Sequence, residues 1–387
     1  MKVKKCLSLI LMAVIILTSS TLVIAFNGEE GFEDDENIPF ENEENLPFED
    51  EGEAVLVRGE VLQASEPTEG EKYWEQGVQN LRVRITEGEF EGQEFELEHM
   101  LFGVHTLELS AGDRVMVYIE TTDGEITTIG VDEIIRDHII YILLVIFVII
   151  LVAIGGLKGV KALVTLVLMG LAVIYVILPL MMEGFNPLIL TVAFSIVVAI
   201  FTLLIIGGVN HKSFAAILGT ATGLFLAGIL AWVFANAANL TGYVSEEAQM
   251  LQFIDEGVDF DVRGLLLAGI IIGALGAILD VTMSIASAIE EIKMANPKLK
   301  AAELFSAGMN VGRDIMGTMV NTLILAYTGS ALPLLLLFKA YEQPMSAIIN
   351  SDLIATEIIR AIVGSMGLIV AIPFTALFAA FIHHKKG

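Results

Sequence analysis

The sequence predicts an α-helical integral membrane bundle of about seven transmembrane helices, preceded by a small exported all-β domain that resembles a barrel. Three observations carry this prediction. The 387-residue chain is 55% hydrophobic, and its apolar runs reach the roughly 20 residues that cross a bilayer. All of the excess negative charge lies in residues 27–137. Within residues 53–132 the hydrophobic period changes to two, which is typical of strands.

The N-terminal segment has the composition of an export signal. Three lysines within the first five residues precede an apolar run from Leu7 to Leu17, and small residues up to Ala25 suit signal peptidase. Residues 1–26 are therefore predicted to be a signal peptide cleaved after Ala25. The alternative is an uncleaved signal anchor, which would add an eighth span. Cys6 is the only cysteine, so no disulfide is expected in the exported part.

The charge of the chain is concentrated in one segment. Residues 27–137 hold 32 Asp and Glu against six Lys and Arg, a net charge of −26 that equals the formal charge of the whole chain. Residues 27–52 repeat NIPFE as NLPFE and are predicted to be an acidic disordered linker, because they cannot bury enough apolar surface to fold. So acidic a segment disfavours nucleic acid and anionic lipid as partners.

Residues 53–134 are predicted to form the exported β domain. Five short strands in about 80 residues favour a small antiparallel barrel, like an oligonucleotide-binding fold, although the acidity argues against a nucleic acid ligand. His99 and His105 lie among carboxylates, but two histidines at this spacing are too little to predict a metal site. The expected strands alternate apolar and polar residues between Gly and Asp turns: Val55–Leu62, Leu81–Thr86, Glu94–Glu98, Asp113–Glu120 and Glu125–Val131.

Residues 138–385 are predicted to be the transmembrane helical domain. A separate amphipathic helix is expected over Lys298–Gly312, on the cytoplasmic side. Pro179, Pro333 and Pro373 lie near span ends or within spans and could kink them. The seven expected spans cover residues 139–157, 162–182, 187–207, 214–236, 264–288, 315–338 and 357–381.

The loops between these spans alternate in charge, which predicts the topology. Short positively charged loops stay in the cytoplasm, so the mature N-terminus is expected outside a bacterial cytoplasmic membrane and the C-terminus inside. The positive side carries Lys158, Lys161, His211, Lys212, Lys293, Lys298, Lys300, Arg313, Lys385 and Lys386. The opposite side carries Glu183, the acidic stretch Glu246–Asp261, Glu342 and Asp352.

The helix expected over residues 264–288 has one face of small and polar residues. At about 100° per residue, their spacing of three and four places them within an arc of roughly 80°. A carboxylate in hydrocarbon costs about 3 kcal/mol on insertion scales, so this face is expected to meet protein or water. The residues are Gly269, Gly273, Gly276, Asp280, Ser284, Ser287 and Glu291.

The helix expected over residues 315–338, with the residues before it, carries a second such stripe. Asp280 and Asn321 have similar predicted depths, so the two stripes are expected to face each other. One interpretation is structural: Gly269, Gly273, Gly276 and Gly317 would let the helices pack closely. The other is a pathway for a solute or ion. The second stripe and its neighbours are Asn310, Arg313, Asp314, Gly317, Asn321, Thr322 and Thr328.

Two further residues could act at the membrane, whereas enzymatic signatures are absent from the sequence. Glu357 and Arg360 lie three apart near the outer end of the last expected span, either as a snorkelling ion pair or as an outer gate pair. The sequence contains no phosphate loop, no HExxH and no G-x-S-x-G with an intramembrane base. We therefore expect no enzyme activity, cofactor or metal.

Two motifs in these helices resemble a known family. They are GRDIMGTMVNTLILAY over residues 312–327 and GALGAILDVTMSIAS over residues 273–287. Both look like the YibE/F-like family of bacterial multispanning membrane proteins, and the likeness extends over most of residues 53–385. The resemblance implies an exported N-terminal domain followed by about seven spans, with a role in transport or permeation.

The sequence thus supports two functional hypotheses of different classes. The first is a secondary transporter or permease for a small solute or ion, with Asp280 as the titratable or cation-binding group and Ser284, Asp314 and Asn321 as its neighbours. The second is a non-transporting assembly or signalling protein whose β domain binds a partner. Besides lipid and solute, a second copy of the chain or another membrane protein is an expected partner.

Overall fold

The structure is a computed structural model that describes residues 53–68, 77–101, 108–122, 125–253 and 260–384. The predicted signal peptide and acidic linker lie outside these residues. The chain divides between Ile135 and Arg136 into two compact units.

The first unit is a nearly closed antiparallel barrel of five strands, as predicted. β1 (Glu53–Ala64), β2 (Gly77–Ile85), β3 (Glu94–Leu101), β4 (Arg114–Thr122) and β5 (Glu125–Ile134) are ordered β3-β2-β1-β4-β5. The long β1 pairs with both β2 and β4, and contacts between β3 and β5 bring the two sheet edges together. Alternating residues fill the interior: Val57, Val61, Leu81, Val83, Ile85, Leu97, Leu109, Val115, Val117 and Ile119.

A buried glutamine explains why β2 begins four residues before the predicted start. Gln79 is 2% exposed, and its side-chain Nε2 donates to the carbonyl oxygens of Ser65 at 3.0 Å and Leu109 at 2.7 Å. The backbone N–H of Leu109 donates to Gln79 Oε1 at 3.0 Å. Hydropathy patterning cannot foresee such a strand residue, because its polar side chain points inward and is satisfied by loop backbone.

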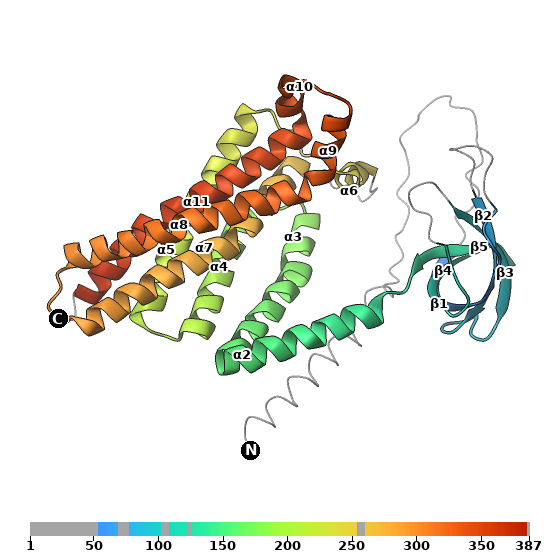
Figure 1. Ribbon diagram of the computed structural model, residues 1–387, viewed down its shortest axis with the longest axis horizontal. Coiled ribbons are helices and arrows are strands. Elements are labelled where there is room, and N and C mark those ends of the chain that lie inside the picture. The colour runs from blue at the N-terminus through green and yellow to red at the C-terminus, as the bar shows by residue number, and fades with distance from the viewer. Residues whose placement is uncertain (1–52, 69–76, 102–107, 123–124, 254–259, 385–387) are drawn as a thin grey trace, which may run out of the picture. The chain divides into compact units, whose positions relative to one another are not determined.

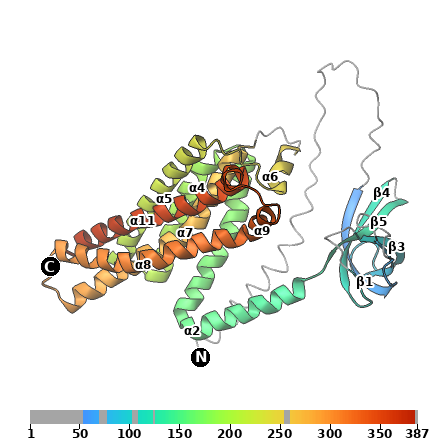
Figure 2. The same cartoon turned by 45° about the horizontal axis from the view of Figure 1, so that its top comes forward.

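The second unit is all-helical (Figure 1). Its long helices run side by side in both ribbon views (Figures 1 and 2). Its elements are α2 (Asp137–Ala172), the π-helix η2 (Val173–Ile177), α3 (Leu178–Met182), α4 (Pro187–Gly207), α5 (His211–Ala237), α6 (Glu246–Met250), η3 (Leu251–Phe253), α7 (Val262–Ala295), α8 (Ala301–Ser330), α9 (Leu332–Ala340), α10 (Met345–Asn350) and α11 (Asp352–His384).

Local side chains fix where three of the long helices begin. The Asn186 side chain accepts a hydrogen bond from the Ile189 N–H at the start of α4, and Asn210 does the same for Ser213 in α5. Asp261 accepts from the Gly264 N–H at 2.7 Å at the start of α7. These are N-cap interactions, which satisfy backbone donors that the first turn of a helix leaves without a partner.

The described residues contain five helical segments that are long and apolar enough to span a membrane, and a sixth if α8 and α9 count as one bent span. The first segment, Asp137–Met182, has 46 residues, which at about 1.5 Å per residue is more than twice the thickness of a hydrocarbon core. Gly156 interrupts it with φ 54° and ψ −132°, and two arms diverge there (Figure 1). With both arms counted separately and α8–α9 counted as one bent span, the number of segments is seven, consistent with the predicted number.

The sixth predicted span differs from the structure at both ends. Residues 301–312, which we expected to be part of a separate amphipathic helix over Lys298–Gly312, are the first turns of the continuous α8. The helix then ends at Ser330, and α9 leaves it at an angle of 59°. Pro333 lies in the first turn of α9, where its missing N–H is tolerated, and the break falls just before it.

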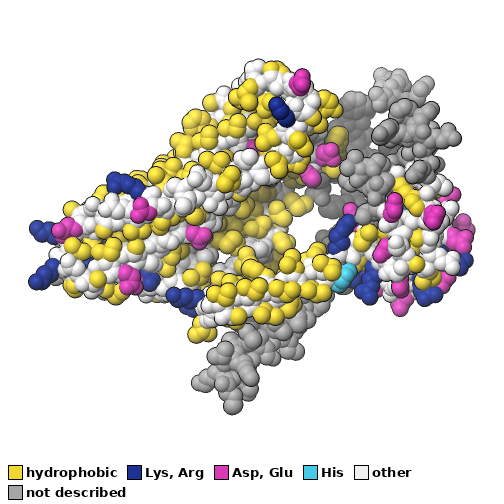
Figure 3. All heavy atoms as spheres, in the orientation of Figure 1, with side chains coloured by type: hydrophobic (Ala, Val, Ile, Leu, Met, Phe, Trp, Pro, Cys, Tyr) yellow, Lys and Arg dark blue, Asp and Glu magenta, His cyan; other side chains and the backbone are white. Residues whose placement is uncertain are grey.

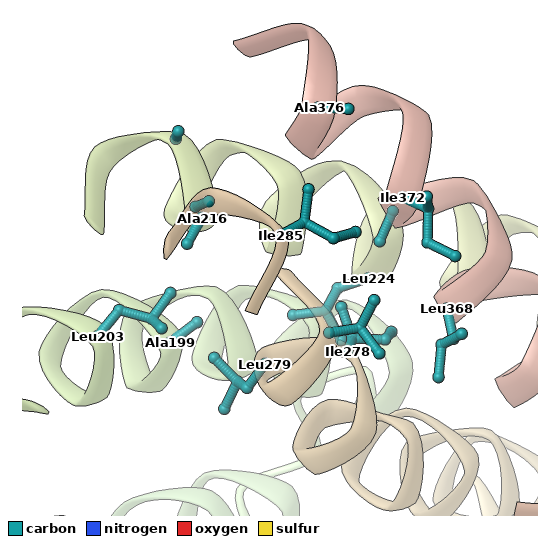
Figure 4. Packing of buried hydrophobic residues seen from close by; sticks show 14 of the residues in the cluster. Ala199, Leu203, Ala216, Leu224, Ile278, Leu279, Ile285, Leu368, Ile372 and Ala376 are labelled. Atoms are coloured by element: carbon teal, nitrogen blue, oxygen red, sulfur yellow. The ribbon is translucent and has the colours of Figure 1, made fainter. Parts of the chain in front are cut away.

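The core of the helical unit lies where α4, α5, α7 and α11 meet. Figure 4 shows small side chains such as Ala216 near branched ones such as Ile285 in this core. A Cβ on Gly223 would lie 2.8 Å from Ala371 Cβ and 3.1 Å from the Gly367 carbonyl oxygen. Gly223 therefore packs closely against α11.

Candidate functional site: the polar faces of α7 and α8

The polar residues of α7 lie on the side of the helix that its neighbours leave uncovered. Asp280 stands near the middle of the 34-residue helix and is exposed, as is Ser284, whereas Ser287 is half-buried. The opposite side is packed into the core through residues such as Ile278 and Ile285. The one-faced distribution predicted from the sequence is therefore present, but in the single chain that face is open.

The glycines of this α7 face do not all pack against the same chain. A Cβ added to Gly269 or Gly276 would meet no atom within 4 Å. At Gly273 it would collide with the hydroxyl of Tyr327 from α8. Among the described residues, the packing role predicted for these glycines thus has a partner only at Gly273.

The polar residues of α8 are likewise exposed. The Arg313 guanidinium donates to Asn310 Oδ1 at 3.0 Å, and the Thr322 hydroxyl donates to the Thr318 carbonyl at 2.9 Å. A Cβ on Gly317 would meet nothing within 4 Å. Asp314, Gly317, Asn321 and Thr328 share the exposure, while the helix packs on α7 and α11 through Leu304, Gly308, Gly312 and Leu323.

The two polar faces do not pair with each other within one chain. In the described part of the chain, no hydrogen bond or ion pair joins a polar side chain of the α7 stripe to one of the α8 stripe, including Asp280 and Asn321. The helices instead touch through other residues: Gly312 meets Ile285, and Gly308 meets Ile289. Their polar faces lie outside this contact, so the expected seam between Asp280 and Asn321 is not closed by the single chain.

A second polar cluster joins α8 to α11. Arg360 Nη1 lies 3.2 Å from Glu357 Oε1, and both side chains are mostly buried. The Arg360 guanidinium also stands over the ring of Tyr327, 5.9 Å from its centroid. Glu357 Oε2 and Arg360 Nε are buried without a hydrogen-bond partner. The predicted pair therefore exists as an ion pair, and its role as a gate remains a prediction.

Tyr327 is the member of this cluster that sequence reasoning missed as a site residue. It links Gly273 of the α7 face to the Glu357–Arg360 pair of α11. It belongs to the quoted motif of residues 312–327, but one tyrosine in an apolar helix gives no signal of its own. The Thr220–Thr282 hydrogen bond of 2.7 Å, buried between α5 and α7, was also missed, because neither threonine lies on one of the two polar stripes.

The end of the bundle near the α7–α8 turn is charged. Lys212 of α5 and Glu290 of α7 form an ion pair of 2.8 Å, and the rings of His211 and His383 lie 6.1 Å apart. Lys and Arg gather at this end of the helical unit, while hydrophobic side chains cover much of the face between its ends (Figure 3). This is the pattern expected when the middle of the bundle lies in lipid.

No metal centre is assembled in the described residues: no three His, Cys, Asp or Glu side chains come together there. His105, one of the two weak candidates in the β domain, lies outside the described part of the chain. The β barrel does carry an open groove of about 790 Å³ along β1, β2 and β3. Its lining includes Asn80, Arg82 and Glu96, and Arg82 pairs with Glu96 at 2.8 Å.

The profile of the family described as YibE/F-like protein matches residues 143–385, which is nearly the whole helical unit. No curated protein and no solved structure matches the chain. The matched range contains both polar faces and the Glu357–Arg360 pair.

Proposed function

The chain belongs to the YibE/F-like family, and on that premise we propose that it is a permease or secondary transporter for a small solute or ion. Its long apolar helices make it a multi-pass membrane protein. The observation that carries the proposal is Asp280, a carboxylate near the middle of a span and on an uncovered face. An ionisable residue at such a position is by default a functional candidate, because burying it there is costly.

The proposed pathway runs along the polar faces of α7 and α8. Asp280 would take up a proton or bind a cation, and Ser284 one turn away would supply a hydroxyl ligand or hydrogen-bond donor. On α8, Asp314 and Asn321 offer an acceptor and an amide. Gly269, Gly276 and Gly317 leave room for a hydrated solute, because no side chain projects from them and no described atom would lie within 4 Å of a Cβ there.

The Glu357–Arg360 pair is proposed to control access to this pathway from one end. Tyr327 contacts Gly273 on the α7 face and the Arg360 guanidinium on α11. A change in the ion pair would therefore move a side chain that reaches the pathway. The unsatisfied Glu357 Oε2 and Arg360 Nε leave hydrogen-bonding capacity for a second arrangement.

The direct test compares flux through wild-type protein with flux through Asp280→Asn in proteoliposomes. Influx of H⁺, Na⁺ and K⁺ would be followed with entrapped fluorescent indicators, and untargeted solute profiling of cells with and without the chain would identify other cargo. Flux above that of empty liposomes is expected for wild type, and its loss for Asp280→Asn. Glu183→Gln, which neutralises an exposed carboxylate at the end of α3, is the matched control. Undiminished flux in Asp280→Asn would overturn the assignment.

We also propose an orientation from the charge pattern. The end of the bundle with Lys212, Lys293 and Lys300 would face the bacterial cytoplasm, and the β unit would be exported. Single cysteines introduced at Ser65 and at Lys300, in a Cys6→Ser background, would report this orientation. A membrane-impermeant maleimide should label the first in intact cells and the second only after lysis; the reverse labelling would overturn it.

A second, non-enzymatic function rests on the groove of the β barrel. A groove of this size, with an ion pair and an amide on its wall, could hold a segment of a partner protein. In that case the chain would be an assembly or signalling protein, and its helices would only anchor it. Photo-cross-linking from position 80 that recovers a defined partner, together with absent flux, would favour this function over transport.

A further inference from the structure

The uncovered polar face of the helical unit needs a partner inside the membrane. We define this face by three residues of α7 (Gly276, Asp280, Ser284) and two of α8 (Gly317, Asn321), all of them exposed in the single chain. Lipid tails offer no hydrogen bonds, so an aspartate and an asparagine at this depth are normally covered by protein or water.

The glycines of the face give an independent reason to expect protein there. Several glycines of the bundle stand where another helix approaches: a Cβ on Gly367 would lie 2.7 Å from Ala227 Cβ, and one on Gly308 2.5 Å from Ile289 Cδ1. Others, such as Gly170 and Gly329, meet nothing within 4 Å. At Gly276 and Gly317 a Cβ would meet nothing within 4 Å. The fold of one chain therefore does not need glycine at these two positions, whereas a close approach by another helix would need it.

The apolar segments of the same chain are poor candidates for that helix. The first arm of α2 leaves most of its large side chains exposed, but residues 139–155 contain one side chain capable of hydrogen bonding, Tyr141. The N-terminal apolar run from Leu7 to Leu17 has only Ser8. Neither sequence supplies enough polar groups to match the face.

We propose that this face is the contact surface between two copies of the chain. The face carries its own complement: a carboxylate acceptor at Asp280, and donors at Ser284 and Asn321. A twofold axis brings the same patch of both copies together, so each acceptor can meet a donor of the other copy. Small residues on both sides allow the backbones to approach closely.

This inference goes beyond the proposed function and does not depend on it. Two copies can meet along this face whether or not solute passes between them. If transport occurs, the carboxylates of both copies line a shared pathway, and the site is incomplete in one chain. Oligomer formation and flux are measured separately, so that either proposal can fail alone.

Disulfide trapping tests the contact directly, because Cys6 is the only native cysteine. In a Cys6→Ser background, Ser284→Cys and Asn321→Cys would be oxidised in native membranes with copper phenanthroline, and in parallel treated with a short bismaleimide. A cross-linked species of twice the mass of the uncross-linked monomer is expected for at least one of the two. Phe225→Cys on α5, whose native side chain is 57% exposed, is the control for random collision. Absence of cross-linking at both positions, or equal yield at position 225, would overturn the proposal.

A bulky side chain on the face tests it in the purified full-length protein. Gly276→Leu and Gly317→Leu have room within one chain, so the monomer should fold and melt as wild type does. Both are expected to shift the dimer–monomer midpoint, measured by native mass spectrometry in detergent, to at least tenfold higher protein concentration. Gly170→Leu on α2, where a Cβ also meets nothing within 4 Å, should leave that midpoint unchanged. A monomeric wild type, or leucine variants that dimerise like wild type, would overturn the proposal.

Discussion

Tyr327 of α8 lies with its hydroxyl against the backbone of Gly273 in α7, and its ring lies beneath the guanidinium of Arg360 in α11. One side chain therefore connects three helices and links the two polar clusters of the bundle. The absence of a side chain at position 273 is what gives the phenol its space.

The first prediction concerns this tyrosine. Replacing Tyr327 by Leu removes the cation–π interaction with Arg360 and should destabilise the protein by about 0.5–2 kcal/mol. Tyr327→Phe keeps the aromatic ring and should stay closer to wild type. Thermal unfolding in detergent would measure both. A double-mutant cycle with Arg360→Met isolates the pairwise energy, and a coupling of zero would contradict the assignment.

The second prediction concerns the crossing of α5 and α11. Gly223→Ala places a methyl group against Ala371 and the Gly367 carbonyl, so the two helices must move apart. Overpacking of this kind should cost about 1–3 kcal/mol. Gly170→Ala adds the same methyl group in open space and should not destabilise the protein. Unfolding midpoints of the two variants that coincide would show that the crossing is looser than the structure indicates.

The third prediction concerns the ion pair at the charged end of the bundle. Lys212 and Glu290 are each about one-fifth exposed, so their pairing should contribute about 0.2–1 kcal/mol and weaken with added salt. Lys212→Gln and Glu290→Gln should each lower stability, and the double variant should lose less than their sum. Additive losses would show that the contact carries no stabilisation, and a coupling indifferent to salt would show that its stabilisation is not that of a screened ion pair.

The fourth prediction concerns Gln79 in the β barrel. Gln79→Leu keeps the side-chain size but leaves the backbone groups of Ser65 and Leu109 without partners, which should cost about 1–3 kcal/mol for each buried group left unsatisfied. Hydrogen exchange of the full-length protein would report this as faster exchange at the Leu109 amide and along β2. Asn80→Leu, which changes a neighbouring exposed side chain, should leave that amide protected.

The architecture was predictable from the sequence because its signals are periodic. Alternation of apolar and polar residues identified all five strands, with bounds that differ from the structure by a few residues. Apolar runs located the spans. An apolar run does not show where the helix that contains it begins, however. Polar residues such as Glu303 and Asn310 placed the predicted start of the sixth span at residue 315, although backbone hydrogen bonding continues the helix back to Ala301.

The candidate site was predictable only in part. Helical spacing assigned Asp280 and Ser284 to one face, and the structure agrees. Spacing does not tell what that face meets, so the expectation that it would pair with Asn321 in the same chain had no support beyond similar depth. Contacts made by single residues, such as Tyr327 with Gly273, depend on how helices cross and leave no periodic trace.

The bend at Gly156 also bears on how the protein enters the membrane during synthesis. A backbone with φ 54° and ψ −132° is readily accessible only to glycine, so the chain interrupts its own first apolar stretch there. Lys158 and Lys161 follow directly, and positive charges resist translocation. The insertion machinery would therefore receive two arms of spanning length as a helical hairpin with a basic tip, rather than one rod too long for any bilayer.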